Sequence, residues 1–216
     1  MRKWLWAILF SFLSAAHATE PANLGFVHPF YVGGVGGWGS TTWQGLVPKA
    51  NKQNAAISIS TPVAVQEGGR VWGLSIGYEL MPTFALEANY MMFPNAQITF
   101  DEYSLYAFDE NTLYLNTKTQ TASLSAKVMF LIPTATSIRV FSSAGIAGVF
   151  RQDFMNNCYR ISPTFAFGIN KLLNERILLE IGTNYTAGYG ESEINPVLDF
   201  VPFLYSGYGK IALRFG

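Results

Sequence analysis

Seven charged residues share an unusual setting, because each lies on the small or polar face of a segment whose other face is apolar. Three are acidic and four are basic, so they nearly neutralise one another. Buried charges are tolerated when they are paired or hydrogen-bonded, so these residue types favour an interior network of ion pairs. The seven residues are Glu79, Glu87, Lys127, Arg139, Glu180, Lys210 and Arg214.

Glu87 and Lys127 are the clearest candidate pair. Each lies three residues from the same end of its segment, and the two segments should be neighbouring strands, so both side chains should lie near one level. We predict an ion pair between them, with Arg139 and then Glu180, Lys210 and Arg214 extending the network. The alternative is a set of independent, water-screened side chains.

Candidate catalytic, cofactor and metal sites are scarce. His28 precedes the first predicted strand, which is a poor position for the base of a hydrolase. Residues 33–37, Gly-Gly-Val-Gly-Gly, lack the Lys-Ser/Thr ending of a phosphate loop. The single cysteine, Cys158, excludes an intramolecular disulfide and a thiolate zinc site. We predict no enzymatic activity, no cofactor and no metal centre.

Two long connections carry residues that suggest external contacts. Their acids match no dedicated calcium loop, so solvated loops are favoured over divalent-cation bridges to lipopolysaccharide. These acids are Asp101, Glu102, Asp109, Glu110, Glu191, Glu193 and Asp199. One connection is also apolar enough to fold over a barrel mouth or to contact a partner. Its apolar residues are Tyr103, Tyr106, Phe108, Tyr114 and Leu115.

The start of the chain predicts export. Arg2 and Lys3 precede an apolar stretch, and Ala16-His17-Ala18 is a small-x-small cleavage site, so residues 1–18 form the predicted signal peptide and residues 19–216 one domain. Without 1–18, 12 basic residues face 14 acidic ones, a formal charge of −2 that disfavours nucleic acid as a partner. No later apolar run suits a spanning helix, which leaves a closed barrel as the membrane solution.

Eight segments with strand-like patterning follow. In five of them the two faces clearly differ. The other three show a weaker pattern, because 30–38 is rich in glycine and ambiguous in facing, 138–150 is almost wholly small or apolar, and 161–171 has Phe165, Phe167 and Ile169 on one side. Each segment is long enough to cross a bilayer when tilted. They cover residues 30–38, 72–79, 84–92, 123–130, 138–150, 161–171, 176–186 and 205–215. We predict an all-β fold: an eight-stranded antiparallel up-and-down transmembrane barrel, with ten strands as the open alternative.

The connections alternate in length. Those at 80–83, 132–136 and 172–175 are short, those at 44–67, 94–117 and 187–202 are long, and 151–160 is intermediate. Short periplasmic turns and long external loops are typical of outer-membrane barrels. The sequence therefore predicts both termini on the periplasmic side.

The distribution of charged residues indicates which face of the strands meets lipid. A membrane barrel turns its apolar faces outward, whereas a soluble lipocalin-like barrel turns them inward around a ligand. In these segments the charged residues are confined to one face, and this distribution favours the membrane barrel. Aromatics near strand ends predict two interfacial girdles, formed by Tyr78, Phe84, Phe130 and Phe215 at one end and Tyr90, Phe93, Phe150, Tyr185 and Tyr205 at the other.

The C-terminal segment Lys210-Ile211-Ala212-Leu213-Arg214-Phe215 resembles the assembly signal of small outer-membrane barrels. With the strand layout, residues 26–215 resemble the OmpA membrane domain and its OmpX-like relatives. Leu213 replaces a commoner aromatic, and Gly216 follows the usually final Phe. The resemblance implies outer-membrane localisation, with Ile211, Leu213 and Phe215 recognised by the barrel-assembly machinery, and lipid and lipopolysaccharide as neighbours.

The predicted function is an integral outer-membrane barrel that supports the envelope and displays loops to an external protein or host surface. An eight-stranded barrel is filled by side chains, so a wide channel is not expected. The alternative is a narrow gated, porin-like pore in which Glu87 exchanges Lys127 for another partner such as Arg139. A secreted ligand-binding barrel and an enzyme follow as further alternatives.

Overall fold

The computed structural model describes residues 29–46, 62–101, 114–132, 138–154, 157–189 and 200–216. These parts are mostly β-strand, with one short 3₁₀ turn, η2 (Trp43–Leu46). They contain no helix that is both long and apolar enough to span a bilayer. The predicted signal peptide and His28 lie outside the described residues, as do all the predicted acidic loop residues except Asp101.

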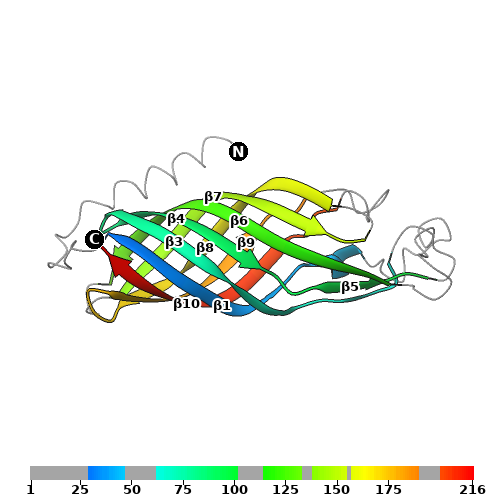
Figure 1. Ribbon diagram of the computed structural model, residues 1–216, viewed down its shortest axis with the longest axis horizontal. Coiled ribbons are helices and arrows are strands. Elements are labelled where there is room, and N and C mark those ends of the chain that lie inside the picture. The colour runs from blue at the N-terminus through cyan, green and yellow to red at the C-terminus, as the bar shows by residue number, and fades with distance from the viewer. Residues whose placement is uncertain (1–28, 47–61, 102–113, 133–137, 155–156, 190–199) are drawn as a thin grey trace.

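Eight long antiparallel strands form a closed barrel, as predicted from the sequence (Figure 1). Strand β1 pairs with β10 along its whole length and thereby closes the barrel. The alternation of apolar and small or polar residues allows each strand to place one face on each side of this wall. The strands are β1 (Phe30–Ser40), β3 (Gly69–Met81), β4 (Phe84–Met92), β6 (Tyr114–Leu131), β7 (Ile138–Gln152), β8 (Asn157–Leu172), β9 (Ile177–Thr186) and β10 (Leu204–Phe215).

Two short strands extend the wall at one end. Strand β5 (Ala96–Thr99) pairs with the first residues of β6, and β2 (Ala64–Gln66) pairs with β5. The sequence leaves open whether the long connection 94–117 extends strands beyond the membrane, and the structure shows that it does at both of its ends. The interpretation of 151–160 as a connection is wrong, because pairing continues to Gln152 and Asn157. Backbone hydrogen bonds do not require the apolar alternation that sequence patterns reveal.

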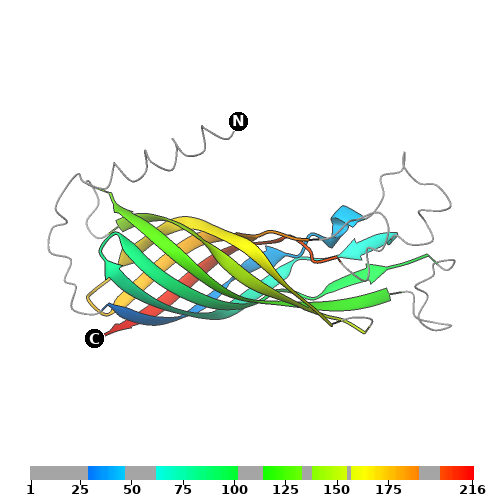
Figure 2. The same cartoon turned by 90° about the horizontal axis from the view of Figure 1, so that it is seen from above.

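The two ends of the barrel differ. Strands β3 and β4 are joined by Pro82 and Thr83, and β8 and β9 by residues 173–176, at the end that also holds the C-terminus (Figure 2). We call this the short-turn end. Strands β2 and β5 lie at the opposite, long-loop end. Pro82 fits a turn because no ladder donor is needed there.

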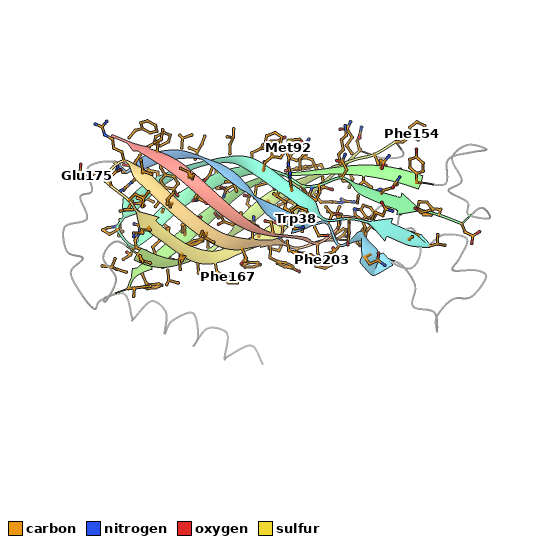
Figure 3. All side chains as sticks on the ribbon, turned by 90° about the horizontal axis from the view of Figure 1, so that it is seen from below. Trp38, Met92, Phe154, Phe167, Glu175 and Phe203 are labelled. Carbon is orange, nitrogen blue, oxygen red and sulfur yellow. The ribbon has the colours of Figure 1, made fainter. Side chains whose placement is uncertain are left out.

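The apolar faces of the strands point outward. On β3, for example, Trp72, Leu74 and Ile76 are exposed whereas Ser75 and Glu79 are buried. Figure 3 shows carbon-rich side chains around the outside of the barrel, between Glu175 at the short-turn end and Phe154 at the other end. This arrangement is opposite to that of a soluble barrel and fits a wall that faces lipid.

Phe93 does not join the outer aromatic girdle. It is only 7% exposed and packs in the interior cluster. Strand β4 ends at Met92, and the Phe93 amide donates to the Thr119 carbonyl at 3.0 Å. The chain thus leaves the regular alternation of β4 at this residue, and period-two reasoning fails there. The other predicted girdle members are exposed or half-buried.

Candidate functional site: the barrel interior

All seven predicted interior charges are buried inside the barrel. They form two clusters instead of one network. We call Glu87, Lys127, Glu180 and Lys210 the quartet, and Glu79, Arg139 and Arg214 the triad. The triad lies at the short-turn end. Glu79 is two residues from the end of β3, Arg139 is the second residue of β7, and Arg214 is the last but one residue of β10.

The quartet is a closed ring of alternating charges. Lys127 Nζ lies 2.6 Å from Glu87 Oε2, which is the predicted pair, and 2.9 Å from Glu180 Oε2. Lys210 Nζ lies 2.6 Å from Glu87 Oε2 and 2.8 Å from Glu180 Oε1. Each charge therefore has two opposite neighbours, which offsets the cost of removing it from water.

The ring joins opposite walls of the barrel. Glu87 is on β4 and Lys127 on β6, whereas Glu180 and Lys210 are on β9 and β10. The bridges from Lys210 to Glu87 and from Lys127 to Glu180 therefore cross the interior. An eight-stranded barrel is narrow enough for such contacts.

Two tyrosines complete the hydrogen bonding of the quartet. Tyr31 donates its hydroxyl proton to Glu87 Oε2 at 2.6 Å, and Tyr208 donates to Glu180 Oε1 at 3.0 Å. The Phe141 ring lies 4.4 Å from Lys127 Nζ, a cation–π contact. Sequence analysis did not assign these aromatics to the site. The available signal was period two, which places Tyr208 on the same face of its strand as Lys210.

Gly77 gives the Tyr31 ring its space. A Cβ on Gly77 would lie 2.1 Å from the ring carbon Cζ of Tyr31. We expect Gly77→Ala to displace the ring from Glu87 and to destabilise the folded barrel by about 1–3 kcal/mol, the usual cost of overpacking. In a Tyr31→Ala background the same change should cost less than about 0.5 kcal/mol. Urea unfolding of the four proteins measures the difference, and equal costs in both backgrounds would refute this role.

The triad is held by fewer partners. Glu79 accepts from Arg139 Nη2 at 2.8 Å through one carboxylate oxygen and from Arg214 Nη2 at 2.7 Å through the other. Arg139 Nε donates to Asn170 Oδ1 at 2.9 Å. Arg139 is thus engaged away from the quartet. The predicted exchange of Glu87 from Lys127 to Arg139 has no geometric support, and Lys210 is the alternative partner within reach.

Apolar side chains fill the interior on the long-loop side of the quartet: Val71, Met91, Phe93, Val149, Val201 and Leu204. A cavity of about 20 Å³ touches both Glu87 and Met91 and has polar walls that include Asn89, Ser143 and Asn184. This volume has room for about one water molecule. This cavity lies between the quartet and the apolar side chains on its long-loop side.

A second apolar cluster covers the long-loop end. It consists of Trp43, Ala96, Ile98, Phe100, Leu115 and Phe200. Arg151 stacks on Trp43, with 4.7 Å from its Cζ to the ring centroid, and donates through Nη1 to the Phe200 carbonyl at 2.7 Å. Of the aromatic-loop residues predicted to cover the mouth, Leu115 does so, Tyr114 is exposed, and the other three lie outside the described residues.

An apolar exterior, a closed wall of eight antiparallel strands and paired internal charges together define the fold of a small outer-membrane β-barrel. No family model matches the sequence, and no curated protein matches it either. Solved structures do match. The N-terminal barrel domain of Pseudomonas aeruginosa OprF aligns with a TM-score of 0.51 and 12% identity, over 87% of this chain and 98% of that one.

Two further structures show the same fold. Neisserial surface protein A aligns with a TM-score of 0.51 and 12% identity, covering 86% of this chain and 97% of its own. The outer membrane protein OprG from Pseudomonas aeruginosa aligns with a TM-score of 0.50 and 13% identity, covering 87% of this chain and 97% of its own. At these identities the likeness concerns the fold, and it confirms the resemblance to small eight-stranded outer-membrane barrels.

Proposed function

We propose that the chain is an integral outer-membrane barrel with a closed interior, which supports the envelope and presents its long-loop end for surface contacts. The observation that carries this proposal is the inverted distribution of residues, with ion-paired charges inside and an apolar belt outside. The short-turn end would face the periplasm, following export by the predicted signal peptide. We propose no catalytic role, no cofactor and no metal for the chain.

The interior contacts support a plug and not a channel. The quartet links opposite walls of the barrel. Apolar side chains fill the interior on its long-loop side, and a second apolar cluster covers the long-loop end. We expect the purified full chain to give no steady conductance in planar lipid bilayers. A stable open channel in the unmodified protein would contradict the closed interior and favour the pore.

A narrow gated pore is the second candidate. The observation in its favour is that Glu87 already contacts both lysines of the quartet, so either one could release it. If the quartet is the gate, Lys127→Ala removes two of its four bridges and should produce brief openings in the same bilayer experiment. Conductance unchanged by Lys127→Ala would argue against this gate.

The C-terminal strand supports a contact with the assembly machinery. Ile211, Leu213 and Phe215 are all exposed on one face of β10, as a recognition signal for an unfolded or inserting strand requires. In the folded barrel this face is part of the apolar belt. We propose that the assembly machinery binds these residues before β10 closes on β1. In the inserted barrel, lipid of the periplasmic leaflet would surround them, and lipopolysaccharide would surround the long-loop end of the belt.

A further inference from the structure

Two hollows on the outside of the barrel meet near its long-loop end. The larger, about 640 Å³, lies between the ends of β1 and β10 and the short strand β2. The smaller, about 270 Å³, lies over β8, β9 and β10. Both are lined by Tyr205 and Gly207, so they form one continuous surface. An occupant of both would need a polar part joined to an apolar part.

The larger hollow has the chemistry of a sugar site. Trp38 and Tyr205 are 65% and 51% exposed, and each lies on the exposed, outward face of its strand. Exposed rings of this kind stack on the apolar faces of sugar rings, while amides bond their hydroxyl groups. The side chains of Gln44 and Gln66 are exposed in the same hollow.

The polar side of the larger hollow is held in place by Glu67. Its carboxylate accepts from the backbone amide of Trp43 at 2.5 Å and from that of Gln44 at 3.3 Å. Thr41 also donates to it at 3.3 Å. These bonds fix the η2 turn against β2, so the two glutamines lie on a defined support.

A positive charge stands beside Trp38. Arg70 does not line either hollow, but it is directly opposite Trp38 in the β1–β3 register and is exposed on the same outer face of the wall. The next residue, Val71, points into the barrel. Within the described part of the chain no carboxylate pairs with Arg70. A guanidinium group in this position suits a phosphate, which it can bind through two parallel hydrogen bonds.

The smaller hollow is apolar and suits an acyl chain. Phe165, Phe167 and Tyr185 line it, and each is exposed on the outside of the wall. Gly207 forms the junction between the two hollows. A Cβ there would meet nothing within 4 Å, so no packing within the barrel requires glycine at this position. A larger residue would instead occupy the junction.

We propose that this surface binds a phosphorylated glycolipid of the outer leaflet. The phosphate contacts Arg70, a sugar ring lies over Trp38 and Tyr205, and one acyl chain lies in the smaller hollow. The order of these parts, from the long-loop end toward the middle of the wall, matches the order of headgroup and chain in a membrane. This inference rests on the proposed outer-membrane location and adds a defined lipid site to it.

The test uses the full chain purified in an amine-oxide detergent and diphosphoryl lipid A as the probe, with bound lipid counted by native mass spectrometry. We expect lipid A to bind about tenfold more tightly than phosphatidylglycerol, because only lipid A carries both sugar and phosphate. Gly207→Val and Arg70→Ala should each weaken lipid A binding by about tenfold. Equal binding of the two lipids would overturn the proposal.

Gly34→Val is the matched control, because Gly34 also faces outward with nothing within 4 Å of an added Cβ, yet lines neither hollow. It should bind lipid A like the unmodified chain. Equal binding by Gly207→Val and Gly34→Val would also overturn the proposal. If Gly207→Val does not fold, the binding of lipid A by Arg70→Ala tests the proposal, and unchanged binding by that variant overturns it. A heat-dependent gel shift in each sample reports the barrel itself, and its loss in the unmodified chain would instead contradict the proposed function.

Discussion

Glu87→Ala should be the most destabilising single substitution of an interior charge. Glu87 contacts Lys127, Lys210 and Tyr31, each at 2.6 Å, so its removal leaves two buried lysines with one remaining carboxylate. Breaking a buried ion pair from one side costs about 3–5 kcal/mol. Urea unfolding in lipid vesicles measures this loss. Glu175→Ala, at the exposed β8–β9 turn, is the control and should change stability by less than about 0.5 kcal/mol.

A second substitution distinguishes two contributions to the loss of stability in Glu87→Ala: the ion pairs that are lost and the unpaired positive charge that remains buried. In Glu87→Ala with Lys210→Met, Lys127 and Glu180 remain as a neutral pair at 2.9 Å. The double variant should therefore be more stable than Glu87→Ala alone, because no excess positive charge stays buried. If both variants lose the same stability as Glu175→Ala, the quartet does not hold the barrel together.

Ile181→Arg should prevent stable insertion into a bilayer. Ile181 is 67% exposed and lies in the middle of β9, opposite Gly209 on β10 and Ile169 on β8. Arginine at the bilayer midplane on the lipid face of a barrel costs about 2–4 kcal/mol. On a water-facing surface the same change would be nearly neutral.

The measurement is the fraction of protein that folds into phosphatidylcholine vesicles, judged by gel mobility without boiling. Asn157→Arg is the matched control, since Asn157 is exposed at the β7–β8 hairpin, beyond the middle of the wall. It should fold like the unmodified chain. Equal folding of Ile181→Arg and Asn157→Arg would show that Ile181 does not face lipid.

The barrel strands were predictable because lipid and interior impose different residues on alternate positions. Sequence reasoning placed Glu87 and Lys127 at one level because their strands are neighbours. It did not find that Lys210 reaches Glu87 across the interior, since contacts between opposite walls depend on strand tilt and barrel width. Sequence reasoning also predicted one continuous network, because it could not show that the triad lies too far along the barrel to contact the quartet.

The long-loop end was less predictable. Beyond the apolar belt, lipid no longer selects apolar residues for the outer face. β5 still alternates, but its apolar residues Ala96 and Ile98 are buried and its polar residues Gln97 and Thr99 face outward. This alternation is the reverse of that in the belt, so no outward apolar face marks β5 as part of the wall. The second apolar cluster brings together Trp43, Leu115 and Phe200 from three distant parts of the chain. Tertiary packing of this kind leaves no local pattern in any one segment. The Tyr31 contact with Glu87 was hidden because Tyr31 lies in a glycine-rich strand, β1, whose inner and outer faces the sequence does not distinguish.

The proposed function, the interior ion pairs and the lipid site all require the chain to be a closed barrel in an outer membrane. Expression of the full chain in a Gram-negative host, followed by isolation of its outer membrane and gel electrophoresis with and without boiling, tests this claim. We expect the protein in that fraction, extracted only by detergent, with a mobility that shifts on heating. Recovery as a soluble protein without a heat-dependent shift would contradict it.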